Sequence, residues 1–187
     1  INILINRKRK TFISQIIMPF LNVTNENHSD VMLNRMVIAA CYEKLGNCAA
    51  ALQSLDNTSQ IREEIFEESD PLCGFIYRLF GRIYRGMKKY SKALECFEKC
   101  VTIFQKRLSE KCVHLSITYS DIGDIHRLIS DYHNALIFNR RALQIRESIQ
   151  GNSPRYRTNF IHIENLEDEM RIKKQYSYLS IVRQSRN

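Results

Sequence analysis

The chain has 187 residues, 44% hydrophobic and 26% charged, which suits an ordinary folded domain and excludes a disordered chain. No apolar run approaches the roughly 18 residues that a bilayer-spanning helix needs, so we expect no membrane span. The net charge of +8 is uneven: residues 30–69 carry three basic and seven acidic side chains, and residues 70–111 carry ten and four. This local pattern differs from a uniform polycation and disfavours nucleic acid as the partner.

The first segment, residues 1–29, is basic and begins with Ile rather than Met, so we expect a piece of a longer protein. Its cationic run, Arg7 to Lys10, is typical of a solvated terminus, and the alternatives are a nuclear signal or a phosphate contact. Residues 12–21 are amphipathic and could end a preceding helical unit. Residues 22–29 are predicted to form a loop.

A repeat of 42 residues follows, and it can be checked by counting. Shifting the sequence by this length aligns Ala39 with Gly81 and Gly123, Tyr42 with Tyr84 and His126, Ala51 with Ala93 and Ala135, and Leu52 with Leu94 and Leu136. The repeat defines three units, residues 30–69, 70–111 and 112–153. Such periodicity indicates a stacked array of like structural units.

Each unit is predicted to contain two helices, because its apolar residues recur at three- and four-residue steps. Turns interrupt this pattern at Gly86 to Lys89 and at Ser130 to Asp131. Pro71 lies at a unit start, where its ring suits the first turn of a helix. The aligned small residues let the helices of a pair approach closely. The predicted fold class is therefore all-α, built from antiparallel helix pairs.

The third unit and the C-terminal segment depart from the pattern. Asn139 stands where the second unit has Phe97, and His126 stands where it has Tyr84, so a polar partner or solvent access is expected there. Residues 154–187 lose the register and are predicted to form capping helices, one at 156–170 and another beginning at 176–182. A capping unit has a more polar outer face.

These residues carry a resemblance to a known repeat. The spacing of Gly81, Tyr84, Tyr90 and Ala93 is similar to that of the tetratricopeptide repeat. The phrases GRIYRGMKKYSKALECFEKCVTIFQ and GDIHRLISDYHNALIFNRRALQIRE resemble the longer repeats of the kinesin light chain type. The resemblance covers residues 30–153 and implies a right-handed superhelical solenoid that binds other proteins.

In that family the first helices of successive units line a concave groove that holds a peptide. The matching positions here are Leu33, Met36, Ala40 and Glu43 in the first unit, Phe75, Arg78, Arg82 and Arg85 in the second, and Ile117, Ser120, Asp124 and Arg127 in the third. The resemblance therefore implies a peptide-binding groove at these residues.

Three arginines of the second unit predict the chemistry of the ligand. Arg78, Arg82 and Arg85 recur on one helical face, and a guanidinium group engages two carboxylate oxygens together. We therefore expect an acidic peptide with apolar flanks, whose binding is abolished by Arg78→Ala with Arg82→Ala at little cost in melting temperature. The alternative is a solvated face, paired in part with Asp121 and Asp124.

Catalysis, metal binding and cofactors are not expected. None of the six cysteines has C-x-x-C spacing, and the histidines form no credible ligand set. The cysteines mostly occupy apolar helical positions, which favours a reducing cytoplasmic location. The alternatives to a protein scaffold are a binder of nucleic acid or an anionic surface, and a regulatory appendage of a larger enzyme. Open solenoid ends could also promote self-association.

Overall fold

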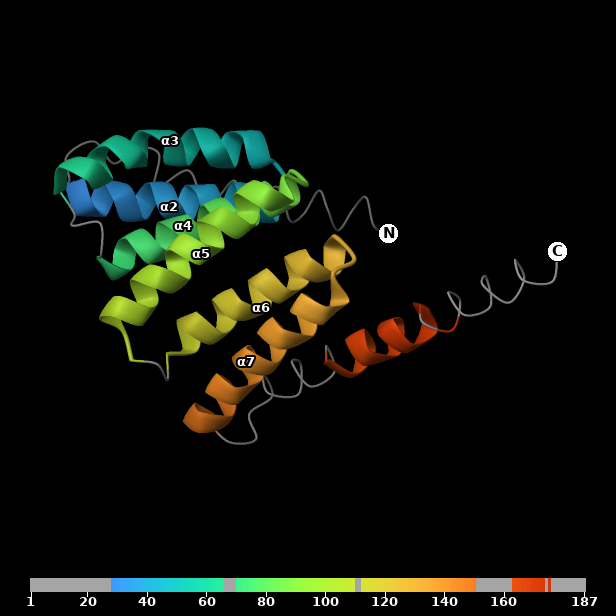
Figure 1. Ribbon diagram of the computed structural model, residues 1–187. Helices are drawn as coiled ribbons and strands as arrows, with labels where there is room; N and C mark the ends of the chain where they lie inside the picture. Colours follow the sequence, from blue (N-terminus) through green and yellow to red (C-terminus); the bar gives the residue numbers. More distant parts are fainter. Residues whose placement is uncertain (1–27, 66–69, 110–111, 151–162, 174, 176–187) are drawn as a thin grey trace. The chain divides into compact units, whose positions relative to one another are not determined.

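The computed structural model describes residues 28–65, 70–109, 112–150, 163–173 and 175. Its helices are α2 (His28–Lys44), α3 (Cys48–Ile65), α4 (Pro71–Gly86), α5 (Tyr90–Arg107), α6 (Val113–Leu128) and α7 (Tyr132–Gln150), with a further helix at 163–173. Within these ranges there is no strand, and the predicted all-helical class is confirmed (Figure 1). The predicted helical segments at 12–21 and 176–182 lie outside the described residues.

Two details of the predicted boundaries differ from the observed helices. The loop predicted at 22–29 is wrong at its end, because α2 already begins at His28. Asp30 lies in the first turn of α2, where a carboxylate interacts favourably with the helix dipole. The helix predicted at 156–170 is described from residue 163 and continues to residue 173.

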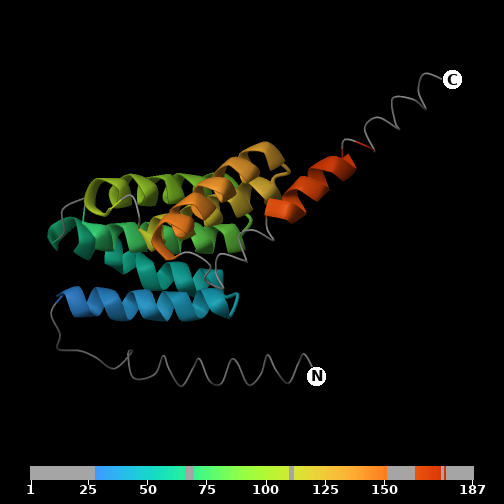
Figure 2. The ribbon, with the colours of Figure 1, turned by 90° about the horizontal axis from the view of Figure 1, so that it is seen from below.

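The chain divides into two compact bodies, which we treat separately: an N-terminal body up to Arg107 and a C-terminal body from Leu108. In the N-terminal body α2 pairs with α3, α4 pairs with α5, and α4 also contacts both helices of the first pair (Figures 1 and 2). In the C-terminal body α6 pairs with α7. Each helix pair is one of the predicted repeat units.

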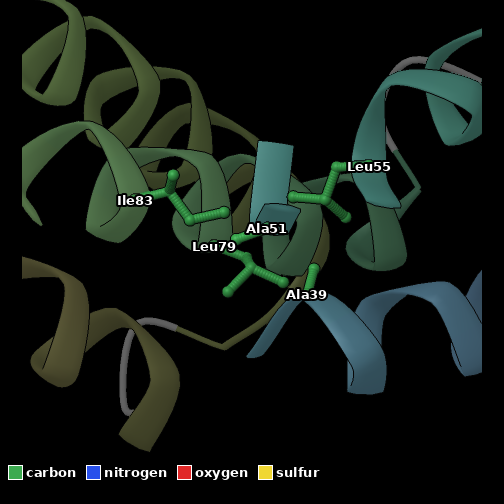
Figure 3. Packing of buried hydrophobic residues seen from close by; sticks show 5 residues of the cluster. All are labelled: Ala39, Ala51, Leu55, Leu79 and Ile83. Atoms are coloured by element: carbon green, nitrogen blue, oxygen red, sulfur yellow. The ribbon is translucent and has the colours of Figure 1, made fainter. Parts of the chain in front are cut away.

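The core of the N-terminal body joins its two helix pairs. Leu79 and Ile83 of α4 pack against a buried surface made by Ala39 of α2 with Ala51 and Leu55 of α3 (Figure 3). The two alanines are fully buried, and their small side chains let the larger residues of α4 come close to both helices. The second pair therefore covers an apolar face that the first pair alone would leave in water.

The small residues predicted at the repeat positions are buried in all three pairs. In α4, a Cβ added to Gly81 would lie 2.6 Å from the ring of Phe97 on α5. In α6, a Cβ added to Gly123 would lie 2.4 Å from the side-chain nitrogen of Asn139 on α7. Only glycine permits these approaches, which confirms the predicted role of the small residues.

The turns within the three pairs have the same backbone structure. The second residue after each helix has a positive φ, at Gly46 (76°), Lys88 (59°) and Ser130 (66°). The next amide donates to the carbonyl five residues earlier, from Asn47 to Tyr42, from Lys89 to Tyr84 and from Asp131 to His126. This is the Schellman motif, and it recurs with the period of the sequence repeat.

Pro71 begins α4, as predicted. Asp70 precedes it with extended backbone, and its side chain accepts a hydrogen bond from the Leu72 amide at 2.7 Å. An aspartate cap followed by proline satisfies one of the free amides of the first turn and fixes where the helix starts.

The helix at 163–173 packs on α7 in the C-terminal body. Ile163 and Leu166 are buried, Arg140 of α7 donates to Glu167 at 2.8 Å, and the Lys173 ammonium lies 4.5 Å from the ring centre of Tyr132. The rest of this helix is largely exposed. A capping helix needs such a mixture of an apolar contact and a polar outer side, and the capping role stays a prediction.

Candidate functional site

The first helices of the two N-terminal pairs, α2 and α4, carry eight of the predicted groove residues in one compact body. Met36 and Ala40 are half-buried and pack against the core shown in Figure 3. Leu33, one turn earlier on α2, is 44% exposed. Exposure therefore differs along the groove positions of α2, from half-buried side chains beside the core to an exposed apolar one.

An ion pair joins two of the predicted groove residues. Arg82 of α4 donates through a terminal guanidinium nitrogen to the Glu43 carboxylate of α2. Their side chains are only 18% and 12% exposed. The structure therefore brings these two positions together across neighbouring helix pairs, and it gives Arg82 a partner other than the expected Asp121 or Asp124.

This pairing changes the electrostatics predicted for the groove. Glu43 offsets the charge of Arg82, so a ligand carboxylate would have to compete with a carboxylate already in place. Arg78 and Arg85 are half-buried on the same helix. The sequence contained a signal for the pair, since Glu43 and Arg82 carry opposite charges at groove positions of successive units, but neither the peptide hypothesis nor the alternative of a solvated face paired these two residues.

Phe75, at the start of the groove positions of α4, is held by an aromatic contact. Its ring packs edge-on against Phe104 of α5, with centroids 5.1 Å apart and planes at 63°. Phe104 is fully buried and Phe75 is half-buried. The contact fixes the Phe75 ring while leaving part of it accessible.

The four predicted groove residues of the third unit lie on α6, in the C-terminal body. Ile117, Ser120 and Asp124 are half-buried and Arg127 is exposed. They are thus accessible to different degrees within their own body.

The unusual polar residues of the third pair find partners in different ways. His126 stacks on Phe138 at 5.4 Å between ring centres and donates through Nδ1 to Asp131 at 3.0 Å. The Asn139 amide nitrogen donates to its own helix, at the Ala135 carbonyl, while its oxygen is buried without a hydrogen bond. The expected polar partner is confirmed for His126 and only half supplied for Asn139.

Asp131 is the centre of this polar cluster. It accepts from both the backbone amide and the side-chain nitrogen of Asn134, at 3.2 and 2.7 Å. These bonds, with a smaller contribution from His126, lower the pKa of the Asp131 carboxyl. The cluster therefore closes the α6–α7 turn and caps α7.

A second surface lies on the side of α5 that carries Glu95, Lys99 and Lys106, which we call its outer side. Lys99 lies 5.6 Å from the ring centre of Tyr77, and the equivalent residues of the third pair, Arg141 and Tyr119, are also 5.6 Å apart. In the second pair this contact borders an open pocket of about 350 Å³. The pocket is lined by Tyr77, Glu95, Glu98, Lys99, Thr102, Ile103 and Lys106.

The cysteines do not form a chemical centre among the described residues. Cys73 and Cys100 are buried, and burial raises the pKa of the Cys96 thiol to about 11. No group of histidine, cysteine and acidic side chains in the described ranges could hold a metal ion. Of the helices that the structure describes, none is long and apolar enough to cross a membrane.

Comparisons with solved structures support the fold. BtubC (BKLC) from P. vanneervenii superimposes with a TM-score of 0.70 at 17% identity, over 87% of this chain and 65% of that one. A protein described as a kinesin light chain with nearly identical TPR-like repeats, from Podosopora anserina, gives 0.66 at 14% identity over 91% and 82%. The N-terminal domain of stress-induced protein-1 from C. elegans gives 0.54 at 16% identity, over 76% and 99%.

The chain thus spans about two thirds of the length of BtubC, and its fold is similar to that of these repeat proteins. No curated protein matches the sequence. The tetratricopeptide repeat family matches residues 31–106 and 87–148, which together span more than half of the 187 residues. The chain therefore belongs to the tetratricopeptide repeat family.

Proposed function

We propose that the chain is a protein-interaction scaffold that holds a peptide segment along α2 and α4, the first helices of the two pairs in its N-terminal body. Tetratricopeptide repeats are interaction scaffolds, and membership of that family supports the general role. The contact that carries the specific proposal is the ion pair between Glu43 and Arg82. It supports a common face for the groove positions of α2 and α4, because a side-chain pair can form only between residues that lie beside each other.

The ligand that suits this face is an acidic peptide with apolar flanks. Three arginines and one glutamate at the groove positions of α2 and α4 leave a net charge of +2. Leu33 and Phe75 offer partly exposed apolar surface beside them. We expect the half-buried Arg78 and Arg85 of α4 to meet the ligand carboxylates.

The test measures peptide affinity for the purified chain and for an Arg78→Ala variant. Peptides with acidic residues between apolar ones should bind. Their affinity for the variant should be lower by on the order of tenfold or more, which is the cost of losing a charged hydrogen bond. Arg82→Ala is unsuitable here, because it would leave Glu43 without its partner and lower stability. The small effect on melting temperature that the sequence predicts for the double variant is therefore expected for Arg78→Ala alone.

Lys99→Ala is the matched control, since it removes one cation from the exposed outer side of α5. An equal loss in both variants would mean that net charge, not the groove, governs binding. Binding to an unrelated oligonucleotide alone, with a steep fall as salt rises, would support the alternative of a nucleic-acid binder.

A further inference from the structure

The turns at one end of the N-terminal body carry a cluster of cations outside the groove. Lys44 ends α2, and Lys88, Lys89 and Lys92 lie in or just after the α4–α5 turn; all four are exposed. The two turns are neighbours, because a Cβ on Gly86 would lie 2.8 Å from the Cys48 sulfur. We call these four lysines the turn lysines.

The lysines of the α4–α5 turn occupy positions where the fold prefers other residues. Lys88 has the positive φ that Gly46 adopts in the preceding pair, and a side chain there costs stability. Lys89 is the residue before α5, where the other pairs have Asn47 and Asp131. Those two side chains accept hydrogen bonds from amides of the first turn, as a lysine cannot.

The charge of these lysines is also unfavourable to the helix that follows. No acidic residue lies in the first turn of α5, and the amino end of a helix repels cations. Two adjacent lysines thus stand where glycine and asparagine would make the same turn more stable. Strained backbone in a native protein is a reason to look for a function there.

Among the side chains that the structure describes, few acidic ones are placed to offset the cluster. Glu43 is held by Arg82. Glu95 lies one turn after Lys92 and 3.3 Å from Lys99, on the outer side of α5. Asp56 lies near the middle of α3. Burial raises the pKa of the Tyr84 phenol, and Cys96, Asp56 and Glu95 add to this rise. The turn lysines therefore form an exposed cationic edge.

We propose that the turn lysines are a docking surface for an acidic segment of a partner protein, separate from the groove. The surface is short, which suits a few carboxylates. The corresponding turn of the third pair has Asp131 and the exposed apolar residues Leu128 and Ile129, and no lysine. A nucleic-acid binder gains from a long basic track, whereas here the cations are confined to two neighbouring turns.

The decisive variant combines Lys88→Gly with Lys89→Asn, which installs the residues of the α2–α3 turn. Its affinity for a short peptide of alternating Glu and Ser should fall about tenfold. Its melting temperature should rise, because both changes favour the turn. A gain in stability with a loss of binding separates a docking role from a structural one.

The matched control combines Lys99→Gln with Lys106→Gln, which removes two cations from the outer side of α5. Lys106 is about 20 Å along the helix from Lys92. This control should leave affinity nearly unchanged, and an equal loss would overturn the proposal. Tighter binding of an oligonucleotide or of vesicles containing phosphatidylserine than of the peptide, lost in the turn variant, would also overturn it.

The proposal does not depend on the groove. The Glu-Ser peptide has no apolar residue to fill the groove, so Arg78→Ala should leave its affinity unaltered. If Arg78→Ala weakens this peptide as much as the turn variant does, the two surfaces are one site and the separate docking surface is ruled out.

Discussion

Glu43 of α2 and Arg82 of α4 form an ion pair across two successive helix pairs, with both side chains mostly withdrawn from water. The residues are 39 positions apart, so the pair is a tertiary contact. Each charge would be poorly solvated without the other. The pair therefore fixes how α4 lies against α2, and the groove positions depend on that register.

We expect Arg82→Ala to lower the free energy of unfolding by about 1–3 kcal/mol, because it leaves the Glu43 carboxylate partly buried without its partner. The double variant, with Glu43→Ala and Arg82→Ala together, should lose much less free energy of unfolding than the sum of the losses in the two single variants. Urea unfolding of the four proteins measures this coupling. Strictly additive losses would show that the pair contributes nothing.

Gly81 and Gly46 should respond to alanine for different reasons. Gly81→Ala should lower stability by about 1–3 kcal/mol, because its new methyl group would overlap the buried Phe97 ring. Gly46→Ala should cost about 1 kcal/mol through its positive φ alone, since no atom lies within 4 Å of the added Cβ. Adding Phe97→Leu should recover part of the loss at Gly81 and none of the loss at Gly46.

Ser130→Gly should raise stability by about 0.5–1 kcal/mol, since Ser130 is exposed and holds a φ of 66° that glycine adopts without strain. Thermal unfolding followed by circular dichroism would measure the gain. His133→Gly, at an exposed position inside α7, is the comparison and should instead lower stability. A loss at Ser130 would mean that its side chain stabilises the turn.

Asn139→Leu should stabilise the C-terminal body by about 1–3 kcal/mol. The change removes a buried amide oxygen that has no hydrogen bond and puts a larger apolar side chain of the same branching beside Gly123. Asn134→Leu is the contrasting variant, because that amide is bonded to Asp131 and its loss should destabilise. Equal effects at the two positions would contradict the difference in hydrogen bonding.

The free energy of unfolding should fall in acid as the Asp131 carboxyl becomes protonated. Its folded-state pKa lies below the ordinary value of 3.8, so it stabilises the fold above that value. This contribution is lost as the pH falls through the folded-state pKa. The pH dependence of unfolding below pH 4 should be shallower in Asn134→Ala than in His126→Gln, because the bonds from Asn134 lower the pKa most. The reverse order would assign the main role to His126.

The repeat made most of the local fold predictable. The aligned alanines and glycines are buried, the turns at Gly86 to Lys89 and Ser130 to Asp131 separate helices, and Pro71 begins α4. These features follow from side-chain size and backbone preference, which act over a few residues. The sequence alignment also held the clue to the turn lysines, since Gly46 aligns with Lys88.

Other features could not be read from the pattern. Arg82 was expected to meet a ligand carboxylate, and the structure pairs it with Glu43 of the preceding unit. Asn139 was expected to find a polar partner and has one for its nitrogen only. Side-chain geometry in the packed structure decides which of several nearby polar groups lies within hydrogen-bonding distance.

By itself, the sequence determined the helical class, the 42-residue unit and the family, because these depend on apolar periodicity and on where small residues recur. Only the tertiary structure decided that Glu43 neutralises Arg82, that Phe97 fills the space over Gly81, and that the lysine turn lies beside the α2–α3 turn. Those contacts join residues far apart in the chain, and they exist only once the helix pairs have packed.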